Sequence, residues 1–331
     1  MRGNPTETAA IGIDVGGTKI AGALVREDGE VLAAQQTRTQ AEQGVPAVIE
    51  RIADLVEGLV EAAPSTPAGI GIGTPGQVDP HEGIVHNAVN LGWVEVPLRR
   101  ELNERLSFSI PVQIYHDSSA SALGERYFGA AQGYDDFVYL GLGTGLGAAV
   151  VTGGRLVMGA AWSAAELGHM VIEEGGAPCA CGLHGCAETI LSGPGLVRLA
   201  RQRLESGEGS PILSEGELTA ESILRAAEMG DGVAREAVSE MGRALGKVMA
   251  ITATVLNPAL FVIGGGLGVA AFDQILPTAL ESLRRNSLPS VHRQVKVRPS
   301  SLASSAVGAA ALVWYAAETD KNTGSRKKEK E

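Results

Sequence analysis

The stretch Ala10-Ile11-Gly12-Ile13-Asp14-Val15-Gly16-Gly17-Thr18-Lys19, near the start of the chain, decides the fold class. Ala10–Val15 is a short apolar run with one acid, and the glycines after it favour a tight turn. Ile20–Val25 follows as a second strand, and the turn residues Arg26–Gly29 lead into a third at Val31–Ala34. We therefore expect a sheet that begins with three consecutive strands.

Strands and helices then alternate along the chain. A helix is predicted over residues 45–63, where apolar residues recur at helical spacing until a proline interrupts them. Two buried strands follow, at Gly69–Gly73 and Ile110–Tyr115. Ser118 or Ser119 is expected to cap the helix after the second strand. The alternation predicts an α/β architecture.

The second half of the chain repeats this order of elements. Its predicted elements are a strand, two helices, a strand and a final alanine-rich helix, at Phe137–Leu142, 219–229, 232–256, Leu260–Ile263 and Ser304–Ala317. With 331 residues, the chain is about twice the usual domain length. We therefore expect two domains of similar construction.

Composition and charge exclude several classes of partner. The chain has 27 Lys and Arg against 38 Asp and Glu, and the net charge of −11 repels the phosphates of nucleic acid. The uncharged stretch Val248–Phe272 is broken by Asn257-Pro258 and by three glycines, so a helix, a turn and a strand are expected there rather than a membrane span. The first ten residues do not resemble a signal peptide, and a cytoplasmic location is expected.

Three strand ends open into glycine: Asp14–Lys19, Gly141–Gly147 and Gly264–Gly268. Backbone N–H groups converge on oxyanions at such turns, and phosphate is the usual ligand. None of the three matches the Walker loop or the dinucleotide fingerprint. Tight turns or close helix packing explain any one of them equally well, but three together favour nucleotide phosphate. Asp14, beside the first turn, is suited to hold Mg²⁺ through water.

A cluster of three cysteines interrupts the second half. Cys179, Cys181 and Cys186 lie within eight residues, an odd number that does not suit a disulfide framework. With one histidine, three thiolates make a closed tetrahedral zinc site, the alternative being reduced cysteines without metal. His169 and His184 are both candidates for the fourth ligand.

Three segments together resemble the ROK family of bacterial sugar kinases, repressors and related proteins. They are Asp14–Ile20, the sequence Glu166-Leu167-Gly168-His169, and the string CACGLHGCAE from Cys179 to Glu188; the resemblance covers about residues 8–318. It implies a structural zinc ion held by His169 rather than His184, together with Cys179, Cys181 and Cys186. It also implies that Glu166, His169 and Glu188 contact the sugar.

The resemblance implies a two-lobed, actin-like ATPase fold of the hexokinase type. The N-terminal lobe would span residues 8–120, with the last helix, 301–318, packing back on it. The C-terminal lobe would span 121–300 and carry a zinc loop at 166–188. Residues 319–331, a mixed-charge tail, are expected to be disordered.

The family's catalytic base corresponds here to Asp117, at the end of the strand predicted at Ile110–Tyr115. Family sugar kinases usually have asparagine directly before this aspartate, whereas this chain has His116. An imidazole cannot reproduce the paired hydrogen bonds of an amide, so the preferred sugar is left open. Gly76 and Asn90 fit the family's sugar-side segments.

The resemblance implies ATP-dependent phosphorylation of a hexose, with glucose to glucose 6-phosphate as the first expectation. Contacts to ATP, assisted by Mg²⁺, are expected at the glycine turns, from Asp14, Gly16, Gly17, Thr18, Lys19, Gly143, Thr144, Gly145, Gly264, Gly265 and Gly266. The alternatives are a kinase for N-acylmannosamine, fructose or a cyclitol, and a non-catalytic, zinc-stapled sugar sensor. The donor is open between ATP and polyphosphate. A homodimer or a higher homo-oligomer is expected. DNA binding is not expected, because the first strand begins too early to leave room for the helix-turn-helix of the family's repressors.

Overall fold

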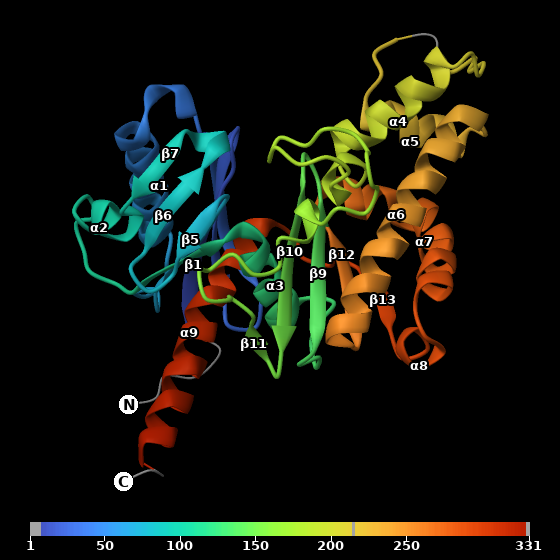
Figure 1. Ribbon diagram of the computed structural model, residues 1–331. Coiled ribbons are helices and arrows are strands. Elements are labelled where there is room, and N and C mark those ends of the chain that lie inside the picture. The colour runs from blue at the N-terminus through green and yellow to red at the C-terminus, as the bar shows by residue number, and fades with distance from the viewer. Residues whose placement is uncertain (1–7, 214–215, 329–331) are drawn as a thin grey trace. The chain divides into compact units, whose positions relative to one another are not determined.

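The structure, a computed structural model, describes residues 8–213 and 216–328, with side chains as far as Thr319. The chain divides into two compact units (Figure 1). Unit 1 contains the described residues up to Gly133, the segment Met158–Ala164 and the residues from Ser301 on. Unit 2 contains Tyr134–Val157 and Ala165–Ser300.

Two of these boundaries differ from those expected from the sequence. The first unit ends at Gly133 instead of residue 120, because helix α3 (Asp117–Phe128) packs along helix α9 (Ser305–Lys328) inside unit 1. The segment Met158–Ala164 returns to unit 1, which no sequence pattern indicated. Helix α9 also runs to Lys328, past the end expected at residue 318, and the expected disorder of the tail stays a prediction. Residues 329–331 lie outside the described part of the chain.

Unit 1 is built on a five-stranded sheet in the order β3-β2-β1-β4-β8. Strands β3, β2 and β1 pair antiparallel with one another, whereas β1, β4 and β8 run parallel. The elements of unit 1 besides α3 and α9 are β1 (Ala9–Val15), β2 (Lys19–Arg26), β3 (Val31–Arg38), η2 (Ala41–Gln43), α1 (Val45–Glu61), β4 (Ile70–Thr74), β5 (Gln77–Asp79), β6 (Ile84–Ala88), η3 (Val89–Leu91), β7 (Trp93–Val96), α2 (Leu98–Asn103) and β8 (Val112–His116).

Opposite faces of this sheet bury different side chains. Ile11 and Ile13 of β1 pack in the core that includes α1, whereas Ala10 packs against α9. Helix α9 approaches the sheet so closely that a Cβ on Gly12 would lie 1.9 Å from the backbone oxygen of Ala306. Gly71 has the same relation to Ala309, at 1.9 Å. Glycine at these strand positions therefore allows the last helix to dock on the first strands, where Figure 1 shows it beside β1.

A small antiparallel sheet, β5-β6-β7, was not anticipated from the sequence. Its strands are three to five residues long, too short for a clear alternating pattern. Trp93 is fully buried at the start of β7 and ties the small sheet to the core of unit 1.

Unit 2 repeats the strand order of unit 1. Its sheet runs β11-β10-β9-β12-β13, with the first three strands antiparallel and the last three parallel. Its elements are β9 (Phe137–Leu142), β10 (Leu146–Thr152), β11 (Arg155–Leu156), η4 (Leu167–His169), η5 (Ala187–Thr189), α4 (Gly193–Glu205), α5 (Ala220–Glu228), α6 (Gly232–Leu256), β12 (Leu260–Gly264), α7 (Gly266–Asn286), α8 (Pro289–His292) and β13 (Lys296–Pro299). The repeated order of elements predicted from the sequence is confirmed.

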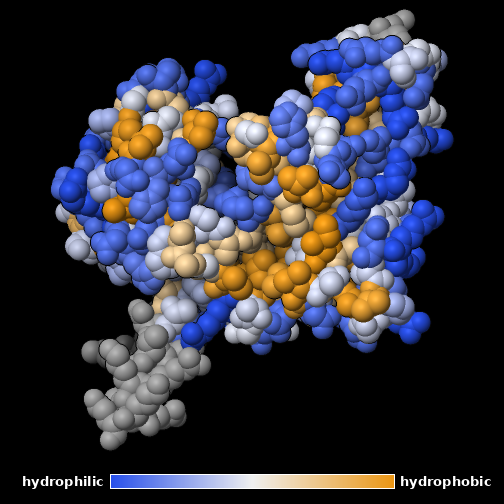
Figure 2. Space-filling view, in the orientation of Figure 1, coloured by the Kyte–Doolittle hydropathy of each residue, from blue (hydrophilic) through white to orange (hydrophobic). Residues whose placement is uncertain are grey.

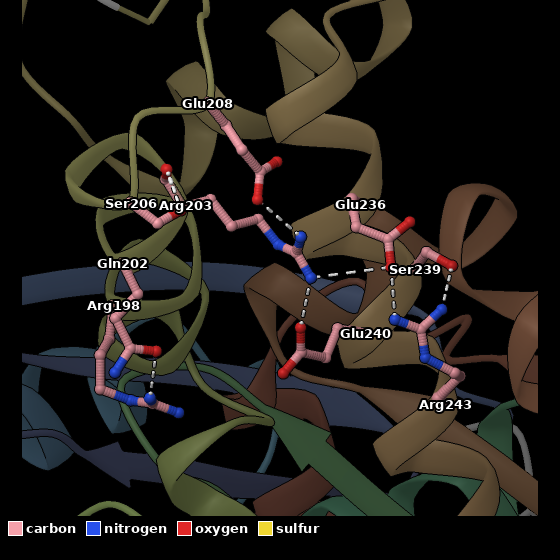
Figure 3. A network of polar contacts seen from close by, with 9 residues as sticks. All are labelled: Arg198, Gln202, Arg203, Ser206, Glu208, Glu236, Ser239, Glu240 and Arg243. Carbon is pink, nitrogen blue, oxygen red and sulfur yellow. Dashed lines mark hydrogen bonds and ion pairs between the residues drawn. The ribbon is translucent and has the colours of Figure 1, made fainter.

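The helices of unit 2 form one apolar core with β9 and β12. Helices α6 and α7 pack against each other, and along the right edge of Figure 2, where they lie, hydrophilic residues predominate. A polar network joins α4 to α6 (Figure 3): the Arg203 guanidinium lies 3.3 Å from Glu208, 3.7 Å from Glu236 and 2.9 Å from Glu240. This network fixes the helix that follows the cysteine cluster.

Within the described residues, none of the helices is both long enough and apolar enough to cross a bilayer. The uncharged stretch around Val248–Phe272 has the predicted alternation of structure. Helix α6 ends at a left-handed Asn257, strand β12 follows, and α7 begins at Gly266.

Candidate active site and metal centre

The carboxyl ends of three parallel strands bring the acids of unit 1 to one edge of its sheet. The register pairs Asp14 of β1 with Gly73 of β4, and Thr74 of β4 with His116 of β8. Asp117 follows as the first residue of α3. Asp14 and Asp117, 103 positions apart in the sequence, are thereby close enough for the charge of Asp117 to act on the Asp14 carboxyl.

Asp14 lies in a costly electrostatic environment. The pKa of its carboxyl is raised to about 6, first by burial and then by the nearby charge of Asp117, while Lys19 and a hydrogen bond with Ser305 lower it in part. The surroundings of Asp14 therefore do not neutralise its negative charge fully when the carboxyl is ionised, so the charge is under-compensated. A bound cation would supply the missing compensation. Ser305, at the start of α9, was missed in the sequence because helix α9 begins almost 300 residues after Asp14.

His116 caps helix α3, a role that the sequence suggested for Ser118 or Ser119. Its Nδ1 accepts a hydrogen bond from the Ser118 backbone N–H at 3.3 Å. The same nitrogen lies 3.2 Å from Oδ1 of Asp117, but one nitrogen cannot accept the amide hydrogen and donate to the carboxylate at once. In the neutral, capping tautomer, Nε2–H is the remaining donor of His116. Asp117 then keeps its lone pairs for other partners, apart from the hydroxyl of Ser118 at 3.1 Å.

The side chains of His116 and Asp117 are partly open to solvent, with 29% and 41% of their surface exposed.

Two further residues expected to contact the sugar, Gly76 and Asn90, lie in the same unit. Gly76 is in the turn between β4 and β5, with a φ of 93°, and Asn90 is exposed on η3. The Cβ of Asn90 lies 3.5 Å from the position that a Cβ on Gly17 would take, so η3 approaches the first glycine turn.

The three glycine turns are divided between the units. In the first, which joins β1 to β2 in unit 1, the Gly16 N–H donates to the Lys19 carbonyl at 2.9 Å, and residues Gly17 to Lys19 are exposed. The second, around Thr144, joins β9 to β10 in unit 2. The third, Gly264 to Gly266, joins β12 to the first turn of α7.

The second and third turns lie on neighbouring strands. Gly264 pairs with Gly141, and a Cβ on Gly265, whose φ is 76°, would lie 2.2 Å from the Leu142 oxygen. Only glycine fits that left-handed position so close to another backbone. The arrangement leaves the N-terminus of α7 at the end of β12, which is a geometry that favours anions.

The four residues of the predicted zinc set come together in unit 2. The ligand atoms of His169, Cys179, Cys181 and Cys186 all lie within 4.8 Å of one another. Nδ1 of His169 is 3.7 Å from the Cys179 sulfur, and the Cys181 and Cys186 sulfurs are 3.6 Å apart. Tetrahedral coordination at about 2.3 Å per Zn–S bond separates two sulfurs by about 3.8 Å. His184 is exposed and is not among the four.

Two thiols of this cluster, Cys186 and Cys179, resist ionisation, whereas the pKa of the exposed Cys181 is lowered, first by a hydrogen bond from the backbone of Leu183. Burial raises the pKa of Cys186 to about 12, and the sulfurs of Cys181 and Cys179 add to the effect. Burial also raises the pKa of Cys179. Thiolates gathered in this way need a cation, so the donor set fits zinc in chemistry as well as in spacing.

The cysteine-bearing segment has little regular structure. Between β11 and α4, only the short helices η4 and η5 and two isolated bridges, Val171 with Cys186 and Pro178 with His184, are present. Glu188 anchors its far end, because its Oε2 accepts the Leu146 N–H of β10 at 2.9 Å. Glu166 at the near end is exposed.

Comparison with known proteins gives this arrangement a family. The ROK family profile matches residues 10–315. The chain belongs to the ROK family. A glucokinase from Halalkalibacterium halodurans is 34% identical over 304 residues, which cover 89% of this chain and 91% of that protein.

Other relatives include both kinases and regulators. A solved ROK family glucokinase from Streptomyces griseus, in complex with glucose and AMPPNP, is 34% identical with a TM-score of 0.78, over 92% of this chain and 98% of that one. A xylose repressor from Caldicellulosiruptor bescii is 34% identical over 260 residues, which cover 77% of this chain and 65% of the repressor. Membership of the ROK family thus leaves the choice between catalysis and regulation to be argued from the site.

The expected site residues of this ROK protein form one group in each unit. Unit 1 holds Asp14, the first glycine turn, Gly76, Asn90, His116 and Asp117. Unit 2 holds the other two glycine turns, Glu166, Glu188 and the Cys₃His group. Within each unit the structure brings together residues that lie far apart in the sequence.

Proposed function

We propose that this chain is an ATP-dependent sugar kinase that phosphorylates glucose on its 6-hydroxyl. The observation that carries the proposal is Asp117, a partly exposed carboxylate at the end of β8. Strand β4 separates it from β1, which carries a second acid whose charge is under-compensated. The glucokinase relatives, which span almost the whole chain, support glucose as the acceptor and ATP as the donor.

Asp117 would act as the general base. Its carboxylate accepts the proton of the sugar hydroxyl while the hydroxyl oxygen bonds to the γ-phosphorus of ATP and the bond from that phosphorus to ADP breaks. An ordinary carboxylate suffices, because the transition state is loose and proton transfer is late. Its helix is capped by His116, so the Asp117 carboxylate is not needed for that purpose.

His116 would stand beside the base as a sugar contact. With Nδ1 occupied by the Ser118 amide, Nε2–H can donate one hydrogen bond to a sugar hydroxyl. Gly76, Asn90, Glu166, His169 and Glu188 are the further proposed contacts.

The glycine turns would hold the nucleotide. Backbone N–H groups in the turns 16–19, 143–145 and 264–266 would bind phosphate oxygens, apart from those of Gly16 and Gly143, which donate within their own turns; the N-terminus of α7 would help. Asp14 fits a magnesium site, since it is a buried oxygen donor whose charge burial and Asp117 leave under-compensated. Bound Mg²⁺ would supply neutralisation of the phosphate charge.

The Cys₃His group fits a structural zinc ion. His169, Cys179, Cys181 and Cys186 would hold it, and no open ligand position would be left for chemistry. In this arrangement, zinc would supply only rigidity to the segment that carries Glu166 and Glu188. A cytoplasmic location and a homodimer stay predictions.

A screen for ADP release tests the proposal. The intact protein is supplied with Mg-ATP and, in separate reactions, glucose, fructose, an N-acylmannosamine and a cyclitol. We expect the largest kcat/KM with glucose. A larger kcat/KM with another acceptor would reassign the substrate, and His116 would then be the first residue to test. Polyphosphate in place of ATP tests the donor in the same assay.

The main rival is a non-catalytic sugar sensor, which the repressor relatives favour. A sensor would bind glucose in calorimetry and release no ADP above background. The two acids at one sheet edge favour the kinase, because a sensor has no need of a base beside a second under-compensated carboxylate.

A further inference from the structure

The return segment, Met158–Ala164, is held in unit 1 although the chain before and after it belongs to unit 2. Gln77, the residue after Gly76, donates from Nε2 to the Ala161 carbonyl at 2.8 Å. The ring of Trp162 lies 4.9 Å from that of His81, with the planes tilted by 59°. The segment closes on itself, since the Ala164 N–H donates to the Met158 carbonyl at 3.1 Å.

The surface that receives Trp162 is rigidly built. The His81 N–H donates to the Asp79 carboxylate at 2.8 Å. Arg99 donates to the carbonyls of His81 at 2.6 Å, Pro80 at 2.7 Å and Val112 at 3.0 Å, and Val112 begins β8. His81 is therefore fixed to the strand that ends beside the proposed base.

The backbone of the return segment is strained at its end. Five non-glycine residues of the described chain have a positive φ, and two of them are Trp162, at 58°, and Ala165, at 69°. A bulky side chain in the left-handed region is unusual and costs free energy, which surrounding contacts must offset. The strain lies directly before Glu166, a proposed sugar contact.

The contacts of Trp162 and the left-handed backbone at Trp162 and Ala165 affect Glu166, because Glu166 follows them closely in the chain. Trp162 precedes Glu166 by only four residues, so the contacts that hold Trp162 restrict the backbone conformations of the short stretch that leads to Glu166. We propose that Trp162, held against His81, is a positioning residue that presents Glu166 to the sugar. The inference rests on the proposed function, because it takes Glu166 as a sugar contact.

Steady-state kinetics of four variants test this inference. Trp162→Gly removes the ring at a backbone position that glycine adopts without strain, and His81→Ala removes its partner. We expect each to raise the KM for glucose about five- to tenfold, the size of one aromatic contact, with kcat and the KM for ATP within about twofold. Trp162→Phe should restore the KM for glucose to within about twofold of the parent value. The double variant Trp162→Gly/His81→Ala should be no worse than either single variant.

Two controls isolate the ring contact. Ala165→Gly relieves strain at the neighbouring left-handed residue and keeps the rings, and His86→Ala removes another histidine of the same small sheet, one that pairs with Glu95 at 3.0 Å. Both should keep the parent KM for glucose. Additive effects in the double variant, a normal KM in Trp162→Gly or an equal rise in Ala165→Gly would overturn the inference. If the parent protein releases no ADP with any sugar, the proposed function fails instead; calorimetric glucose binding by the same variants then tests Trp162 separately.

Discussion

The acid-bearing edge of unit 1 and the cysteine segment of unit 2 hold their functional side chains by different means. In unit 1, Asp14 lies near the end of β1 and Asp117 directly follows β8, and apolar residues of these strands, such as Ile13 and Ile114, are fully inaccessible. In unit 2, residues 166–189 contain two 3₁₀ turns, and Cys181 and His184 are exposed. A hydrophobic core positions the first group, whereas the second has so little core of its own that a metal ion must supply the rigidity.

The comparison predicts that the unit 1 acids can be changed without loss of the fold. Asp117→Asn should lower kcat about 100-fold or more, because it removes the base, and should leave glucose affinity within a few fold. The melting temperature should stay close to that of the parent. ADP-release kinetics and calorimetry measure the two effects. Asp273→Asn, at an exposed position of α7, is the matched control. Near-normal turnover in Asp117→Asn would remove this residue from the mechanism.

Sequence reasoning identifies the strands and the acids at their ends, since apolar runs and turn residues are local signals. It does not reveal that Asp14 and Asp117 share one environment, because their proximity depends on the pairing of β1, β4 and β8. The cap of α3 was assigned to serine by residue preference, whereas the side-chain direction of His116 decides it. The return of Met158–Ala164 to unit 1 has no local signal at all.

In the cysteine segment, the loss of a zinc ligand is expected to disturb the local fold and glucose binding, unlike the Asp117→Asn change in unit 1. Cys181 is exposed, so Cys181→Ser removes a zinc ligand with little loss of packing. The variant should bind less than one zinc ion per chain, lose amide-exchange protection over residues 166–189, and bind glucose about tenfold or more weakly. Unit 1 should keep its protection.

His184→Ala is the control for this experiment. It changes an exposed histidine of the same segment that lies outside the Cys₃His group, so zinc content and glucose affinity should be those of the parent. Full glucose affinity in a demonstrably zinc-free protein would contradict the proposed role of the metal.

The smallest expected effect concerns stability at the unit 1 edge. The pKa of Asp14 in the folded protein, about 6, lies above the ordinary value of 3.8, so ionisation of this residue destabilises the fold. The cost is fully present above pH 6 and fades as the pH falls toward 3.8. Asp14→Asn should therefore raise the free energy of unfolding at pH 8 by up to about 3 kcal/mol, and the gain should shrink as the solution is acidified.

Thermal unfolding of Asp14→Asn and the parent protein between pH 4 and pH 8, without nucleotide or divalent cations, measures this difference. The same variant should lose turnover, because Asp14 is the proposed magnesium residue. Asp54→Asn, at an exposed position of α1, should change neither quantity. An Asp14→Asn protein that melts below the parent at pH 8 would show that the Asp14 carboxylate stabilises the fold.

In the proposed reaction, Asp117 takes the proton from the sugar hydroxyl. A crystal structure of the protein with glucose and a non-hydrolysable ATP analogue tests it most directly. We expect the Asp117 carboxylate within about 2.6–3.2 Å of the glucose 6-hydroxyl oxygen. A bound sugar whose oxygens all lie beyond hydrogen-bonding reach of Asp117 would contradict it.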